Sequence, residues 1–280
     1  MRLTPLPAPR LVPSRGQLPV LLSVPHSGRD YPQWLVEKSA RGHSVLCTLE
    51  DPLVDRLVWR ALDQGIGAVI ADAPRAAVDC NRCEDEVDPA LVPGAQTRRL
   101  TPKARGGLGI VPSRTQQHGL LWRGPISHGE LEQRLDQAHR PYHRLIEQEL
   151  ALLVGRFGCA LLLDCHSMPP PSRGIPPVVI GDCHGRSAAR WISDDALHVA
   201  RQAGYDARLN DPFAGGHIID RHGAPHQGVH ALQIEIDRRC YLTETGEPSE
   251  GFDDVAALFQ RLATGLGNLL LSRQFPAAAE

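Results

Sequence analysis

The stretch CALLLDCHS at residues 159–167 decides the fold class of this 280-residue chain. It is a short, nearly continuous apolar run that ends in polar residues, which is typical of a strand buried on both faces. Four further runs of this kind predict strands over 19–26, 67–73, 176–182 and 230–236. Apolar residues at three- and four-residue spacing predict helices over 49–64, 128–156, 186–204 and 252–272. The alternation predicts an α/β fold: a mixed, largely parallel sheet flanked by helices.

Two local signals refine the second predicted helix. Ser127 followed by Glu130 has the spacing of a capping box, so we expect the helix to begin there. Pro141 interrupts its interior, which predicts a kink or two separate helices.

The chain shows no internal repeat and no clear linker, so we expect one domain over 1–280 with an irregular segment at 1–17. Residues 75–127 carry little periodicity and many Arg, Pro and Gly. We interpret them as a long excursion over the sheet edge, and loops of that length tend to be functional. The part over 83–127 is expected to shape the substrate site.

Composition limits the function. With 30 Lys+Arg against 32 Asp+Glu the net charge is −2, which gives no general attraction to nucleic acid or acidic membranes, so we expect a small-molecule partner. No apolar run approaches the ~18 residues of a membrane span, and the prolines and arginines of the first 16 residues do not resemble a signal peptide. Seven cysteines do not suggest a disulfide framework. These features favour a cytoplasmic protein; oligomeric state stays open.

Three polar clusters lie at or near the ends of predicted strands, where ligand sites of open α/β sheets form. His26 ends the first strand and is followed by a turn at Ser27-Gly28. Asp164 and His166 are two residues apart, so on a strand they face one side while Cys165 faces the other. Glu235 is a carboxylate inside an otherwise apolar strand, and a charge there needs a partner or a function.

Two histidines and a carboxylate are the minimum set for a catalytic zinc that keeps one position for water. His26 and His166 supply the imidazoles, and Asp51 is the candidate carboxylate, with Glu50 and Asp30 as alternatives. We place Asp51 at the start of a helix, on one face with Asp55. This set also suits Mn²⁺ or Co²⁺. The competing interpretation is that the two histidines are ordinary hydrogen-bonded residues at the sheet edge.

The remaining polar residues fit a hydrolase. Glu235 is the candidate general base that takes a proton from the attacking water. Asn81 and Arg82 are candidates to bind a substrate carboxylate, because a guanidinium can hold it with two hydrogen bonds. Several histidines follow the Gly215-Gly216 pair of the 210–223 loop, and we take His217 as the candidate for substrate contact.

Other histidine and cysteine pairs suggest no chemistry. The four-residue spacing of His139 and His143 is disturbed by Pro141, so we expect packing or polar contacts there. Cys80 and Cys83 form a single CxxC, and nothing supports a redox or structural-zinc role for it.

Several short motifs occur in order from about residue 20 to residue 270: VPHSG, DCNR, DCHSMP, GD.HG, NDPFAGGHI and HALQIEI.R..Y. Together they resemble the N-formylglutamate amidohydrolase family. The resemblance implies a fold similar to zinc carboxypeptidases and aspartoacylases, in the zinc-exopeptidase (phosphorylase/hydrolase-like) class, with one zinc at the sheet rim. It places the metal on His26, Asp51 and His166, the catalytic glutamate on Glu235, and substrate carboxylate binding on Asn81 and Arg82.

The resemblance implies hydrolysis of an N-acyl amino acid, N-formyl-L-glutamate to formate and glutamate in histidine catabolism being the first candidate. Two departures leave the substrate open. The carboxypeptidase HxxE is replaced by His26 and an acid some 25 residues further on, and the aromatic residue expected beside that acid is absent from Leu49-Glu50-Asp51. A carboxypeptidase, another N-acyl amino acid deacylase and a non-catalytic carboxylate-binding protein on the same scaffold are the alternatives.

Overall fold

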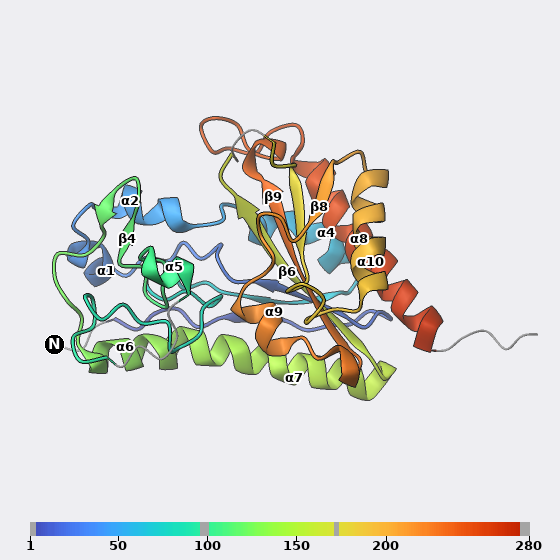
Figure 1. Cartoon of the computed structure of the whole chain (residues 1–280), viewed down its shortest axis with the longest axis horizontal. Coiled ribbons are helices and arrows are strands. Elements are labelled where there is room, and N and C mark those ends of the chain that lie inside the picture. The colour runs from blue at the N-terminus through green and yellow to red at the C-terminus, as the bar shows by residue number, and fades with distance from the viewer. Residues whose placement is uncertain (1–3, 96–100, 171–173, 275–280) are drawn as a thin grey trace, which may run out of the picture. The chain divides into compact units, whose positions relative to one another are not determined.

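The computed structural model describes residues 4–95, 101–170 and 174–274 (Figure 1). The chain divides into two compact units whose segments alternate along the sequence. The first unit comprises Met1–Arg10, Pro25–Glu50 and Ile70–Arg144; the second comprises Leu11–Val24, Asp51–Val69 and Leu145–Glu280. One domain over 1–280 stays a prediction.

The second unit is built on a seven-stranded sheet. Its order is β1(Arg10–Val12), β3(Gly67–Ile70), β2(Val20–Val24), β6(Ala160–Met168), β9(Val229–Asp237), β7(Val178–Gly181), β8(Ala207–Leu209). β6 pairs in parallel with β2 on one side and β9 on the other, and β8 is parallel to β7. β7 runs antiparallel to β9. The predicted mixed, largely parallel sheet is therefore confirmed.

The five predicted strands correspond to the buried members of this sheet. All residues of β2, β3, β6 and β7 are buried, as their continuous apolar runs indicated. β1 and β8 were not predicted, because each has only three residues and is partly exposed. β1 also gives regular structure to part of the N-terminal segment that was expected to be irregular; residues 1–3 of that segment lie outside the described residues.

Helices pack around the sheet within the second unit. α10(Phe252–Gln274) contacts α4(Trp59–Asp63), α8(Arg190–Gln202) and α3(Val54–Leu57), and α9(His217–His222) packs on β6 and β9 (Figure 1). α10 and α8 correspond to helices predicted from their apolar spacing. Their buried residues include Val255, Phe259, Leu262, Leu266, Ile192 and Ala196.

The prediction of one continuous helix over 49–64 is wrong. The segment consists of a 3₁₀ turn η1(Cys47–Leu49), then α3 and α4 as separate short helices. Leu53 has a φ of 60°, a left-handed conformation that an α-helix cannot contain, and it precedes the first residue of α3. Asp51 therefore lies before the helix, in a short irregular connection, and does not share a helical face with Asp55.

The capping prediction at Ser127 is confirmed, since its side chain accepts a hydrogen bond from the Glu130 backbone N–H at the start of α6(His128–Arg134). After α6 the chain forms a π-helical turn, η2(Leu135–His139), and continues directly as α7(Arg140–Phe157). The π-helical turn ends two residues before Pro141, whose ring cannot fit a regular helix interior. The predicted interruption thus takes the form of a local widening of the helix.

The first unit has its own apolar core and mostly short elements: α1(Gln33–Lys38), α2(His43–Leu46), η1, α5(Pro102–Arg105), β4(Arg114–Thr115), β5(Gly119–Leu120) and α6. Arg134 is buried in it, with its guanidinium 5.2 Å from the Trp34 ring and 5.3 Å from the Trp122 ring. The 83–127 loop belongs to this unit; residues 96–100 lie outside the described part. Among the described residues, no helix is long and apolar enough to cross a membrane.

Candidate active site

The imidazole of His166 contacts two carboxylates, one on each ring nitrogen. It lies on β6, where alternation places Asp164 and His166 on one face and Cys165 on the other. Its Nδ1 is 2.9 Å from Asp51 Oδ2, and its Nε2 is 2.8 Å from Asp164 Oδ2. Although burial lowers the pKa of His166, the charge of Asp164 and the hydrogen bonds to Asp164 and Asp51 raise it well above its usual value.

Asp164 is fixed in turn from the neighbouring strand. Ser23 on β2 is its register partner and donates a hydrogen bond from Oγ to Asp164 Oδ1 at 2.7 Å. Asp164 and Ser23 are both fully buried. The arrangement sets the orientation of the His166 ring, because one nitrogen is committed to a carboxylate that cannot turn away.

Glu235 lies beside His166 on the adjacent strand. The two are register partners of the parallel pair β6 and β9, so their side chains project from the same face. Gln233, the register partner of Asp164, donates from Nε2 to Glu235 Oε1 at 2.8 Å. Sequence alone placed Glu235 in a strand; the register adds that it adjoins the predicted metal ligand.

Arg238 and Tyr241 hold the Asp51 segment, and their roles were missed. Arg238 Nη2 lies 3.3 Å from Asp51 Oδ1, and the Tyr241 hydroxyl donates to the Pro52 carbonyl at 2.7 Å. Both residues follow β9. The R..Y spacing after HALQIEI was the available signal, but no chemistry could be attached to it without the fold.

His26, in the first unit, contacts a buried aspartate. His26 Nε2 is 2.7 Å from Asp79 Oδ1, and the two side chains are 2% and 0% exposed. Arg75 donates to Asp79 Oδ2 at 2.9 Å. Burial alone would raise the pKa of Asp79, but the charges of Arg75, His26 and Arg82 bring it well below its usual range.

The DCNR turn is organised by Asp79 and by backbone hydrogen bonds. Asp79 Oδ1 accepts from the Asn81 N–H at 2.8 Å. The buried Arg82 guanidinium donates from Nε to the Leu108 carbonyl at 2.8 Å and from Nη1 to the Asn81 carbonyl at 2.5 Å. No further hydrogen bond of its Nη2 is found in the described part of the chain.

His139 and His143 support this turn from the helix. Their Nε2 atoms lie 2.9 Å from the Arg82 carbonyl and 3.0 Å from the Cys80 carbonyl. This confirms the expected polar contacts. Cys80 and Cys83 are both free thiols, as are the other five cysteines.

The two alternative acids have other surroundings within the first unit. Glu50 is buried and accepts a hydrogen bond from the Tyr31 hydroxyl at 2.6 Å. Burial raises the pKa of Glu50 despite that hydrogen bond. Asp30 is exposed. Asp51, in contrast, contacts the predicted histidine ligand His166.

His217 is the first residue of α9 and is half-buried. The loop before it is anchored to the turn after β7. Asn210 donates from Nδ2 to Asp182 Oδ1 at 2.7 Å, and the Cys183 N–H donates to the Ala214 carbonyl at 2.7 Å. A Cβ on Gly181 would lie 2.7 Å from the Ala214 carbonyl carbon, so the close approach of the two loops requires glycine there.

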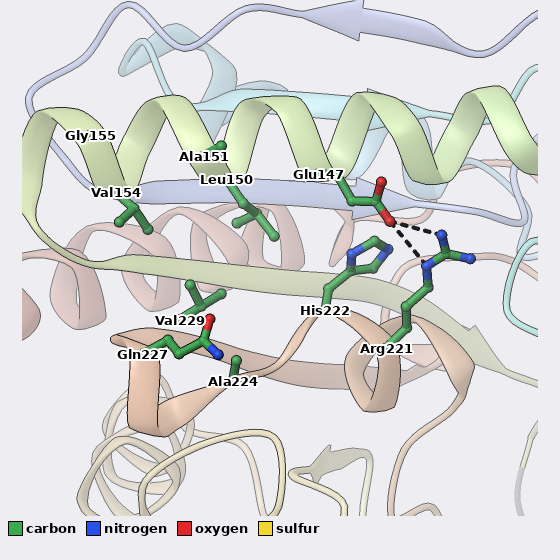
Figure 2. A pocket seen from close by; sticks show the side chains of 10 residues that line it. All are labelled: Glu147, Leu150, Ala151, Val154, Gly155, Arg221, His222, Ala224, Gln227 and Val229. Atoms are coloured by element: carbon green, nitrogen blue, oxygen red, sulfur yellow. Dashed lines mark hydrogen bonds and ion pairs between the residues drawn. The ribbon is translucent and has the colours of Figure 1, made fainter.

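A cavity of about 570 Å³ lies elsewhere in the second unit, between α7 and the segment from α9 to β9 (Figure 2). Figure 2 shows Leu150, Val154 and Val229 along it, with the Glu147–Arg221 ion pair at one end. None of the predicted site residues lines this cavity.

His26, Asp51 and His166 are buried residues that each offer one atom able to bind a metal ion. Imidazole nitrogens and a carboxylate oxygen are the donor set that zinc prefers at catalytic sites. Asp164, which faces the other ring nitrogen of His166, is the kind of carboxylate partner by which proteins orient a metal-binding histidine. The residues present therefore fit a zinc-type ion.

The comparisons with known proteins all lead to N-formylglutamate amidohydrolases or deformylases. The model of a family described as N-formylglutamate amidohydrolase matches residues 18–242. An N-formylglutamate deformylase of Pseudomonas putida is 33% identical over 273 residues, covering 92% of this chain and 94% of that protein. The deformylase of Pseudomonas aeruginosa is 33% identical over 82% of this chain and 84% of its own. The crystal structure of N-formylglutamate amidohydrolase from Ralstonia eutropha JMP134 superposes with a TM-score of 0.82, at 30% identity, covering 92% of this chain and 98% of that one.

Proposed function

The chain belongs to the N-formylglutamate amidohydrolase family, and on this premise we propose that it hydrolyses the amide bond of N-formyl-L-glutamate to formate and L-glutamate. The observation that carries the proposal is the contact of His166 with Asp51 at 2.9 Å, with Glu235 beside His166 on the next strand. A histidine and carboxylate that can bind a metal, next to a second carboxylate, are the parts that metal-assisted amide hydrolysis needs.

We propose that His26, Asp51 and His166 hold one zinc ion. Two residues of chain span at most about 7 Å, so His26 cannot lie far from Val24, the last residue of β2. β2 is the direct neighbour of β6, which carries His166. In both histidines Nε2 faces an aspartate, Asp79 or Asp164, so the metal would be bound through Nδ1. A bound zinc ion polarises the amide carbonyl and lowers the pKa of a water molecule toward ~7.

Glu235 is the proton carrier of the proposed reaction. It adjoins His166 through the strand register, and Gln233 fixes its Oε1 by donating a hydrogen bond. The Glu235 carboxylate would accept the proton of the attacking water and deliver it to the leaving amine.

Asn81 and Arg82 are proposed to bind a carboxylate of the substrate, and His217 to contact it from the start of α9. The Arg82 side chain already donates Nε and Nη1 to backbone carbonyls, which fixes the plane of its guanidinium. A planar donor held in place loses little conformational entropy when it binds a carboxylate.

The test is hydrolysis of N-formyl-L-glutamate by protein purified without chelator, with bound metal measured in the same preparation. We expect one equivalent of zinc and activity that a chelator abolishes. Zinc without activity on this substrate would contradict the substrate assignment, and a panel of other N-acyl amino acids and peptides then separates a deacylase from a carboxypeptidase. Protein that neither contains nor gains metal would favour a carboxylate-binding protein instead.

The proposal extends to a cytoplasmic location and a role in histidine catabolism. The seven free thiols are consistent with a reducing compartment. The small-molecule substrate requires neither a nucleic acid nor a membrane partner.

A further inference from the structure

The two oxygens of Asp51 have different partners. Oδ2 lies 2.9 Å from His166 Nδ1, the nitrogen that faces the proposed ion, whereas Oδ1 lies 3.3 Å from Arg238 Nη2. The Asp51 side chain is only 4% exposed, so water cannot readily take the place of either partner. A carboxylate held in this way has one oxygen for a metal ion and one oxygen committed to a cation.

Arg238 is itself fixed where it can make this contact. It is the first residue of η4(Arg238–Cys240), directly after β9, and its side chain is 17% exposed. Its Nε lies 3.3 Å from Ser167 Oγ, the residue next to His166 on β6. The turn is capped by Asp237, which accepts a hydrogen bond from the Arg239 N–H at 2.9 Å.

The backbone next to Asp51 is fixed from the same turn. Tyr241 is fully buried and donates from its hydroxyl to the Pro52 carbonyl at 2.7 Å. Asp51 lies just before α3, and the first residue of that helix, Val54, donates its N–H to the Asp51 carbonyl at 3.4 Å. The segment after β9 therefore holds both the side chain of Asp51 and the chain beside it.

We propose that Arg238 is a positioning residue that holds Asp51 as a one-oxygen metal ligand. The proposal rests on the proposed function, since it assumes that Asp51 binds a metal ion. It also accounts for the choice of ligand among neighbouring acids: Asp51 is oriented from the second unit by Arg238, whereas Glu50 is bonded to Tyr31.

Removing Arg238 takes a cationic partner away from Oδ1 of Asp51. The carboxylate could then rotate or bind the ion with both oxygens. Either change would alter the one-oxygen binding proposed for Asp51 and lower the affinity for the metal. Loss of a residue that orients a metal ligand typically lowers metal affinity by about 10–100-fold. Lysine cannot replace arginine fully, because a single ammonium cannot contact Ser167 and Asp51 in the forked geometry of a guanidinium.

The experiment measures zinc affinity by competition with a chromogenic chelator for the full-length wild type, Arg238→Met, Arg238→Lys and Tyr241→Phe. Arg239→Met is the matched control, because Arg239 lies in the same turn and bonds Asp237 but does not contact Asp51. We expect affinity to fall by about 10–100-fold in Arg238→Met and less in Arg238→Lys and Tyr241→Phe, with Arg239→Met close to wild type.

A second readout is the visible absorption spectrum of the Co²⁺-loaded proteins, since its intensity depends on the number of ligands around the ion. We expect the spectrum of Arg238→Met to differ from that of wild type and of Arg239→Met. A merely structural role for Arg238 would not change this spectrum in the metal-loaded, folded protein.

The outcomes separate the two proposals. Wild-type zinc affinity and an unchanged Co²⁺ spectrum in Arg238→Met would overturn the role of Arg238 and leave the metal site standing. Equal losses in Arg238→Met and Arg239→Met would also overturn it. A wild-type protein that binds no metal would overturn the metal site and the role of Arg238 together. Should Arg238→Met not fold, Arg238→Lys and Tyr241→Phe decide, and unchanged affinity in both would contradict the proposal.

Discussion

His166 and Glu235 are register partners on two parallel strands, so the imidazole and the carboxylate project side by side from one face of the sheet. The Glu235 backbone is fixed from the other side as well, because Glu235 is also the register partner of Val179 on the antiparallel strand β7. A base placed on a central strand keeps its position relative to the neighbouring ligand more reliably than one on a loop.

Replacing Glu235 with Gln should abolish turnover and leave metal binding intact. The amide keeps the size of the side chain but cannot accept the proton of the attacking water, and loss of a general base typically lowers kcat by about 10²–10⁴-fold. Steady-state kinetics and metal analysis of the same preparation check this. A variant that retains the wild-type rate would show that the base is another group.

Replacing Asp164 with Asn should weaken metal binding. Asp164 faces Nε2 of His166, and the neutral amide would remove the charge that orients the ring, with an expected loss of about 10–100-fold in affinity. Ser23→Ala is the graded control, since Ser23 donates to Asp164 Oδ1, whereas Asp164 contacts His166 through Oδ2. Metal binding that is weaker in Ser23→Ala than in Asp164→Asn would contradict the proposed role of Asp164.

Removing the metal should remove the activity reversibly. Dialysis against a chelator is expected to give inactive, folded protein whose activity returns with Zn²⁺, and also with Mn²⁺ or Co²⁺, because the donor set accepts all three ions. Circular dichroism before and after dialysis separates loss of metal from unfolding. Full activity in protein shown to be free of metal would contradict the metal site.

Replacing Arg134 with Ala should destabilise the protein strongly. The guanidinium donates to the Ala77 carbonyl at 2.9 Å and to Glu130 Oε1 at 2.7 Å, between two tryptophan rings. Removing one partner of a buried ion pair costs about 3–5 kcal/mol, and urea unfolding measures it. Arg144→Ala, at an exposed position, is the control and should change stability by less than about 0.5 kcal/mol.

Glu84 should contribute a part of the stability that is lost in acid. His139, whose Nδ1 lies 3.6 Å from Glu84 Oε1, and the hydrogen bonds from Arg140 lower the pKa of Glu84 to about 2. Because the folded-state pKa lies below the unfolded value, the contribution is present above about pH 4.5 and is lost as the pH falls toward 2. The difference in unfolding free energy between wild type and Glu84→Gln should therefore shrink over that interval. A difference independent of pH would show that Glu84 acts through packing alone.

The sequence predicted the sheet well because its buried strands are continuous apolar runs. CALLLDCHS, at 159–167, differs from β6 only in that the strand begins and ends one residue later. It failed over 49–64, where apolar spacing suggested one helix. The left-handed conformation of Leu53 breaks that helix, and nothing in the identity of a leucine signals a positive φ.

The chemistry-bearing residues were predictable one at a time, but their relationships were not. A histidine and a glutamate in two apolar runs do not show which run pairs with which, and that pairing is what puts His166 opposite Glu235. Arg238 and Tyr241 are the clearest case. Their contacts with Asp51 and Pro52 join residues almost 190 positions apart, a separation at which spacing carries no information.

The chain passes from one compact unit to the other at Val24–Pro25 and at Glu50–Asp51, so two of the proposed ligand residues lie within two positions of a crossing. Extra residues inserted at either crossing would lengthen the chain between His26 or Asp51 and the strand or turn that fixes its position. No crossing between the units falls within 83–127. Loop exchange between relatives to obtain new substrate preferences should therefore succeed within 83–127 and fail at 25–27 and 49–52.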